Sequence, residues 1–249
     1  MKKFGRAILI LSLVMMVAMT VSAQDDSDAC MNKGGEWDAS ASKCTIKSGF
    51  EIDVNYPLFI SQYPFAQKII ESFISDYKTQ FAQSYTPVDD VPVPDINFWT
   101  LSMDYQEFKH GSNLISLLFT TSTYTGGAHP NSDLQSFTFD VKAGKQITQD
   151  DLFIKGSNPW PTIDQMVEQS LTTQLTQAFN APMTDDLTQM MKSGTGTDPQ
   201  NYQVFVIDGD SLVFHFPPYQ VAPYVAGPQS VSIPLSSLST FINPDVIDS

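Results

Sequence analysis

Cysteine, histidine and positive charge are scarce in this sequence. Its 249 residues include two cysteines, three histidines and 13 lysines or arginines, against 27 aspartates or glutamates. The formal net charge of −14 repels phosphate backbones and anionic lipid headgroups, so nucleic acid and membrane surfaces are disfavoured as partners. The same charge would attract a cationic partner, although an acidic surface also serves solubility alone.

Several catalytic motifs are missing as well. The chain has no Gly-x-Ser-x-Gly elbow, which disfavours an α/β-hydrolase, and no His-Glu-x-x-His pair for a zinc enzyme. The stretch Asp208-Gly-Asp-Ser211 suits a hairpin turn and lacks the residue spacing of a calcium-binding loop. We therefore predict neither a metal nor another cofactor.

Long apolar runs are absent after the first residues of the chain. Residues 1–23 combine a basic start, an apolar run from Ala7 to Val21 and a Val-Ser-Ala end. This layout is typical of a secretory signal peptide, here cleaved near Ala23, since the run is shorter than the ~20 residues of a permanent membrane helix. An uncleaved anchor is the alternative. Cleavage would remove three basic and no acidic residues, change the net charge to −17, and leave a secreted or periplasmic protein.

Cys30 and Cys44 would then lie in an oxidising compartment, where two cysteines so close in sequence most simply form a disulfide. Closing a loop of about 15 residues would stabilise the fold by ~3 kcal/mol. Zinc is the rival interpretation, but two cysteines without nearby histidines do not complete a tetrahedral site. Residues 24–47 are therefore predicted to form a small crosslinked segment ahead of the main domain.

Residues 48–94 are predicted to form an N-terminal lobe that carries one long helix. Apolar residues follow helical spacing from about Tyr63 to Tyr85, and a short alternating strand precedes them at 51–56. The proline- and aspartate-rich stretch at 86–94 is expected to connect this lobe to the rest of the chain.

Residues 95–249 are predicted to form a lobe of antiparallel strands packed with amphipathic helices. Apolar and polar residues alternate in short stretches that are separated by turn sequences. Strands are expected at 99–105, 113–124, 137–141, 202–207, 212–216 and 231–233. Helices are expected at 162–179, 184–192 and 234–241, with a helix-initiating cap at Thr148. Because helices and hairpins are segregated along the chain, the predicted fold class is α+β.

The most unusual local chemistry lies at Ser122–Asn131, in the connection between two predicted strands. Gly126 and Gly127 permit backbone angles that a side chain would forbid, and Pro130 fixes its own φ and removes a donor. Such a loop can position a side chain, accept a ligand close to its backbone, or simply turn a corner.

This loop presents Ala128 and His129 next to Tyr124. His129 could order the loop, contact a ligand, or act as a catalytic base if a hydroxyl and a carboxylate lie within reach. We favour the first role, because a polar loop must satisfy its own backbone groups and an imidazole can both donate and accept.

The other histidines and two tyrosines are further candidates. His110 lies in a polar turn and is expected to face solvent, whereas His215 is expected to point away from the apolar face of its strand. Tyr219 and Tyr224 stand among three prolines. They form either a stiff recognition surface or aromatic packing over a sheet edge.

Three stretches together resemble a known family. They are Tyr124–His129, Phe137–Phe153 with its Ala-Gly-Lys turn, and Phe214–Pro234 with its Pro-Pro-Tyr-Gln-Val-Ala-Pro-Tyr core. The combination is similar to the extracytoplasmic domain of unknown function shared by RsiV-type anti-sigma factors and the N-terminal part of PdaC-type peptidoglycan deacetylases. The resemblance covers about residues 50–242 and implies an α+β fold with a helix-bearing lobe followed by a sheet lobe.

The resemblance also bears on function. In the anti-sigma factors this domain binds lysozyme, and some secreted mycobacterial relatives are described as esterases. The sequence shows neither an anti-sigma segment nor a deacetylase domain, so we expect neither transmembrane signalling nor deacetylation. The resemblance favours a non-catalytic envelope domain whose ligand is a lysozyme-like cationic protein or a peptidoglycan-type glycan. Tyr124–Asn131 and Tyr219–Gly227 would form the binding surface; the alternative is a secreted esterase that uses His129 with a nearby hydroxyl.

Overall fold

The computed structural model describes residue 27 and residues 35–46, 50–85 and 99–247. The predicted signal peptide, Cys30 and the connector at 86–94 lie outside the described residues. The predicted disulfide therefore stays a prediction.

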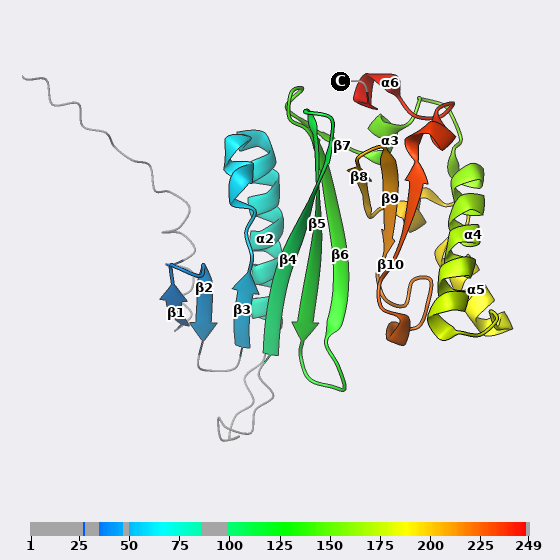
Figure 1. The fold of residues 1–249 in the computed structure, drawn as a ribbon. Coiled ribbons are helices and arrows are strands. Elements are labelled where there is room, and N and C mark those ends of the chain that lie inside the picture. Colours follow the sequence, from blue (N-terminus) through cyan, green and yellow to red (C-terminus); the bar gives the residue numbers. More distant parts are fainter. Residues whose placement is uncertain (1–26, 28–34, 47–49, 86–98, 248–249) are drawn as a thin grey trace, which may run out of the picture.

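Two sheets form the framework of the described chain (Figure 1). The larger sheet contains, in spatial order, β1 (Gly35–Asp38), β2 (Lys43–Ile46), β3 (Phe50–Val54), β4 (Trp99–His110), β5 (Leu114–Tyr124), β6 (Asn131–Asp140) and β7 (Lys145–Ile147). The smaller sheet contains β10 (Gln229–Pro234), β9 (Ser211–Phe216) and β8 (Phe205–Asp208) in that order. Neighbouring strands are antiparallel except for the parallel pair β3 and β4.

Helices cover one side of each sheet and confirm the predicted α+β class. Helix α2 (Pro64–Ser84) buries Ile70, Ile74 and Phe81 against the large sheet. Helix α4 (Trp160–Phe179), followed by α5 (Asp185–Gly194), packs on the small sheet (Figure 1). The shorter elements are η1 (Leu58–Gln62), α3 (Gln149–Leu152), η3 (Pro199–Tyr202), η4 (Tyr224–Ala226), η5 (Leu235–Leu238) and α6 (Pro244–Ile247). Among the described helices, none has the length and hydropathy needed to cross a bilayer.

The helices predicted at 63–85, 162–179 and 184–192 are confirmed as α2, α4 and α5. The predicted cap at Thr148 is confirmed too, and it forms a capping box with Asp151. The helix predicted at 234–241 is wrong. The chain there forms only the short η5 and then turns so that Ile242 can bridge to Phe153. The serines and threonine of this stretch favour turns, because their hydroxyls compete for backbone groups.

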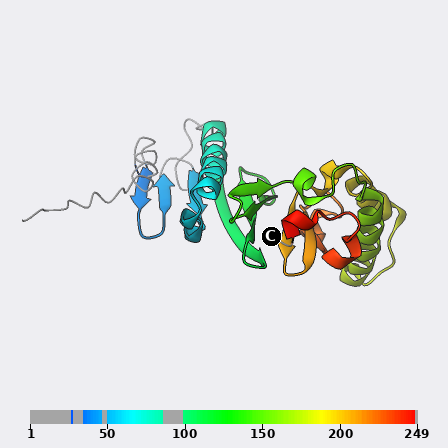
Figure 2. The same ribbon diagram turned by 90° about the horizontal axis from the view of Figure 1, so that it is seen from above.

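The parallel pair β3 and β4 changes the predicted division of the chain. β3 precedes residue 94 and β4 follows it, yet the two strands belong to one sheet. Residue 94 therefore does not separate two packed units. The units that the structure shows are the large sheet with α2, and the small sheet with its helices, which lie side by side in an elongated molecule (Figure 2).

The two sheets meet where an edge of the small sheet lies on a face of the large one. The backbone N–H of Phe205 donates to Ser136 Oγ (2.9 Å) and that of Ile207 donates to Ser116 Oγ (3.0 Å). Ser116 Oγ also lies 2.9 Å from Thr138 Oγ1. All three hydroxyl residues are buried. The open edge of β8 would otherwise carry unpaired donors, so these serines let the strand edge pack against another sheet.

A second contact ties the hairpin turns of the two sheets together. The N–H of Gly209 donates to Lys109 O (2.9 Å), and the ring nitrogens of His110 lie 2.6 Å from Gly209 O and 3.0 Å from Ile247 O. The side chain of His110 is only 15% exposed, so the prediction that it faces solvent is wrong. The sequence of a polar turn does not show whether its hydrogen-bonding groups are paired with water or with another hairpin.

Candidate functional site

The loop between β5 and β6 is built around two glycines. Gly126 and Gly127 have φ angles of +100° and +111°, and a Cβ at either position would meet open space. Glycine is therefore required here for its backbone conformation and not for room. The hydroxyl of Tyr124 donates to Gly127 O (3.0 Å) and closes the loop, which exposes Ala128 and its neighbours to solvent.

His129 is held by two contacts that share one carbonyl group. Its ring stacks on Tyr224, with ring centroids 3.9 Å apart and planes inclined by 17°. His129 Nδ1 and Tyr224 Oη each lie 2.9 Å from Pro130 O. Because a carbonyl oxygen can only accept, both groups donate to it. We call His129, Pro130 and Tyr224 the aromatic clamp.

The clamp joins the two segments that the sequence placed in one surface, although they lie 94 residues apart. The segment at 217–227 is anchored by the buried side chains of Val221 and Ala222. Gln220 Nε2 donates to Gly194 O (2.9 Å) and to Asn201 O (2.8 Å). A Cβ on Gly194 would overlap the Gln220 carbonyl group, so the backbone of this segment approaches α5 very closely.

Two large side chains project outward beside the clamp. Tyr219 is 55% exposed and Val225 is 82% exposed. Tyr219 has a φ of +72°, a left-handed conformation that costs a non-glycine residue about 1 kcal/mol or more. Its N–H donates to Ala222 O (3.1 Å), and its ring centroid lies 5.6 Å from that of Tyr224. The segment thus packs over the small sheet and also displays an aromatic and an aliphatic side chain.

The surroundings of His129 suit loop ordering and contact better than base catalysis. Within the described part of the chain, its side chain forms no ion pair with a carboxylate, and its hydrogen bond goes to a backbone carbonyl. The described residues also contain no cluster of three or more potential metal ligands. Donation from Nδ1 leaves Nε2 as the basic nitrogen, but a base also needs a hydroxyl at that atom.

His215 lies in β9 on the side opposite the buried residues Leu212, Phe214 and Phe216, as predicted. Its ring centroid lies 6.3 Å from that of Phe108 on β4, so the imidazole is placed between the two sheets. Its Nε2 is buried and has no hydrogen-bond partner among the described residues. Burial lowers the pKa of His215 to about 4.

An open pocket of about 310 Å³ lies at the other end of β5, where no sequence motif indicated a site. Its walls come from residues 59–63 and 107–115. These two segments carry no shared motif, and only their placement in the fold brings them together.

Two family models match the chain. The model described as deacetylase PdaC matches residues 45–132, and the model described as a protein of unknown function (DUF3298) matches residues 150–236. A solved DUF3298 family protein from Pseudomonas aeruginosa PAO1 superposes with a TM-score of 0.58 at 16% identity, over 79% of this chain and 86% of that one. This likeness concerns the fold, and together with the two matches it confirms the resemblance drawn from the three motifs.

The chain is also similar to three named proteins. Esterase Rv3036c of Mycobacterium tuberculosis is 27% identical over 91% of this chain and 94% of its own length. Immunogenic protein MPT64 of the same species is 26% identical over 78% of both chains. Peptidoglycan-N-acetylmuramic acid deacetylase PdaC of Bacillus subtilis is 26% identical over 80% of this chain but only 40% of its own length.

The low pKa of His215 predicts a loss of stability in acid. The unfolded chain binds a proton at this residue below pH 6.5, whereas the folded chain does not until about pH 4. Protonation therefore favours unfolding across this window. Above pH 6.5 the titration of His215 does not change the free energy of unfolding. We expect His215 to lower the free energy of unfolding by on the order of 3 kcal/mol between these two pH values.

The measurement is urea unfolding of the wild type and of His215→Phe across this pH range. Other acid-titrating groups contribute to both proteins, so the difference between the two curves isolates His215. Parallel pH profiles would contradict the prediction.

Proposed function

Because this chain carries a PdaC-type domain followed by a DUF3298 domain, we propose that it is an exported binding domain of the cell envelope. Its ligand is a cationic, lysozyme-like protein or a cell-wall glycan, and it performs no catalysis. The relationship to a peptidoglycan deacetylase supports the envelope setting, and the net charge of −14 supports a cationic protein as partner.

The observation that carries the proposal is the clamp with its exposed neighbours. The ring face of His129 stacks on Tyr224, and its Nδ1–H donates to Pro130 O, so neither is available to a ligand. Tyr219 and Val225 remain displayed on a backbone that is fixed by buried contacts. A rigid surface with an exposed tyrosine loses little conformational entropy on binding, which favours affinity.

Calorimetric titration with lysozyme tests this proposal. We expect the wild type to bind, and the double variant Tyr219→Ala/Val225→Ala to bind at least about tenfold more weakly, because exposed aromatic and aliphatic anchors dominate such interfaces. Ile154→Ala is the matched control, since Ile154 is 42% exposed but lies away from the clamp in sequence and contacts. Higher ionic strength should weaken the complex of two oppositely charged proteins. The proposal fails if the wild type binds neither lysozyme nor purified cell-wall glycan.

A hydrolase is the second candidate, and one comparison favours it. The relative named as an esterase aligns with 91% of this chain. In such an enzyme the Nε2 atom of His129 would accept a proton from a hydroxyl group, while Pro130 O would hold the Nδ1–H and orient the ring.

An ester screen separates the two candidates. Under the binding proposal, wild type and His129→Ala hydrolyse p-nitrophenyl esters equally and no faster than buffer. Asn131→Ala, which removes an exposed side chain without a hydroxyl, serves as the control for general disturbance of the same region. Turnover that Asn131→Ala retains and His129→Ala loses would establish the hydrolase instead.

A further inference from the structure

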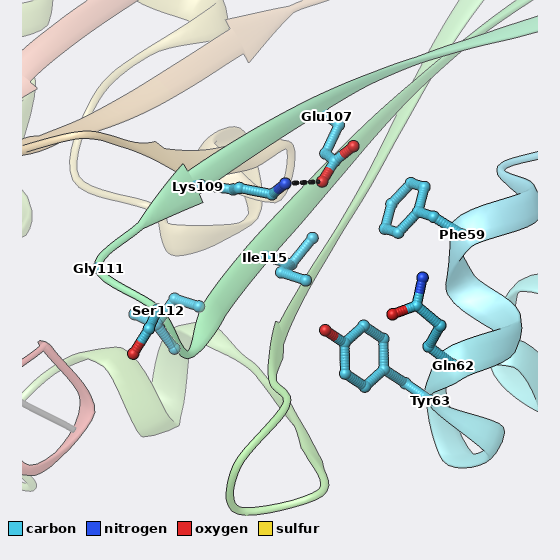
Figure 3. A pocket seen from close by; sticks show the side chains of 9 residues that line it. Phe59, Gln62, Tyr63, Glu107, Lys109, Gly111, Ser112 and Ile115 are labelled. Carbon is cyan, nitrogen blue, oxygen red and sulfur yellow. Dashed lines mark ion pairs between the residues drawn. The ribbon is translucent and has the colours of Figure 1, made fainter.

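We propose that the pocket between η1 and the β4–β5 hairpin binds a neutral saccharide (Figure 3). This inference goes beyond the proposed function, because the pocket lies at the opposite end of β5 from the aromatic clamp. Leu114, which lines the pocket, and Tyr124 lie ten residue steps apart on β5, about 33 Å at 3.3 Å per residue. The pocket volume of about 310 Å³ lies at the lower end of the range that holds small ligands.

The walls combine ring surfaces with hydrogen-bonding groups. Phe59, Gln62 and Tyr63 come from η1 and its junction with α2, and they face Glu107 and Lys109 on β4 across the pocket (Figure 3). The two aromatic rings provide apolar area for the C–H face of a sugar ring. The Gln62 amide and the Tyr63 hydroxyl each both donate and accept, as sugar hydroxyls do.

The charges of the pocket select for a neutral ligand. Of the nine lining residues only Glu107 and Lys109 are charged, and Lys109 Nζ lies 2.8 Å from Glu107 Oε1. A charged ligand would have to compete with one member of this pair. A sugar hydroxyl can instead accept from the ammonium and donate to the carboxylate, so that the ion pair is kept.

The test is a titration followed by amide NMR, with N,N′-diacetylchitobiose and cellobiose as probes. We expect saturable shifts at Gly111, Ser112 and the side-chain amide of Gln62. Gln62→Ala should weaken binding about tenfold, and Tyr63→Phe, which removes only a hydroxyl, should weaken it several-fold. Binding should not change with ionic strength, because neither the ligand nor the ion pair carries net charge.

Tyr219→Ala is the control variant, since this residue belongs to the surface beside the clamp, and its saccharide affinity should equal that of the wild type. The proposal is overturned if neither disaccharide causes saturable shifts at the pocket. It is equally overturned if Gln62→Ala and Tyr63→Phe bind as the wild type does, or if the shifts fall only at the clamp. The two proposals are distinguished by their variants: loss of binding in Tyr219→Ala/Val225→Ala concerns the surface beside the clamp, and loss of binding in Gln62→Ala or Tyr63→Phe concerns the pocket.

Discussion

Two buried serine hydroxyls determine how the halves of this molecule fit together. Ser116 and Ser136 lie on the face of the large sheet and accept the N–H groups of Ile207 and Phe205 from the open edge of β8. A buried N–H that loses its partner costs ~1–3 kcal/mol, so these two hydrogen bonds favour the observed position of the small sheet on the large one. The hydroxyls replace the missing neighbouring strand and make an edge-to-face contact between sheets possible.

The candidate surface is a consequence of this docking. The clamp consists of His129 and Pro130 from the β5–β6 loop and Tyr224 from the small-sheet unit. The ring centroids of His129 and Tyr224 lie 3.9 Å apart, so the clamp is a further contact between the two units that β8 joins. Tyr219 and Val225 are then displayed at a junction of two units, where ligand sites are common. The left-handed backbone of Tyr219 is tolerated because buried neighbours fix this segment.

The long helices and the tight hairpin of this fold could be predicted from the sequence, because each depends on residues that are close together in the chain. The stripe of α2, the helix α4 and the hairpin at Asp208 follow from apolar spacing and turn residues, and the resemblance drawn from the three motifs agrees with the two family models that match the chain. Contacts between residues that are far apart in sequence cannot be predicted from local patterns. Ser116 and Ser136 look like ordinary polar positions on alternating strands, the parallel addition of β3 leaves no mark in spacing, and the pocket arises only when distant segments meet.

The most direct test of this account is native-state hydrogen exchange at the amides of Phe205 and Ile207. We predict that both exchange only through global unfolding, and that Ser136→Ala selectively accelerates exchange at Phe205. Ser132→Ala, four residues earlier on the same face of β6, should leave both amides unchanged. Exchange of both amides in the wild type at the rate of an open strand edge would contradict the account.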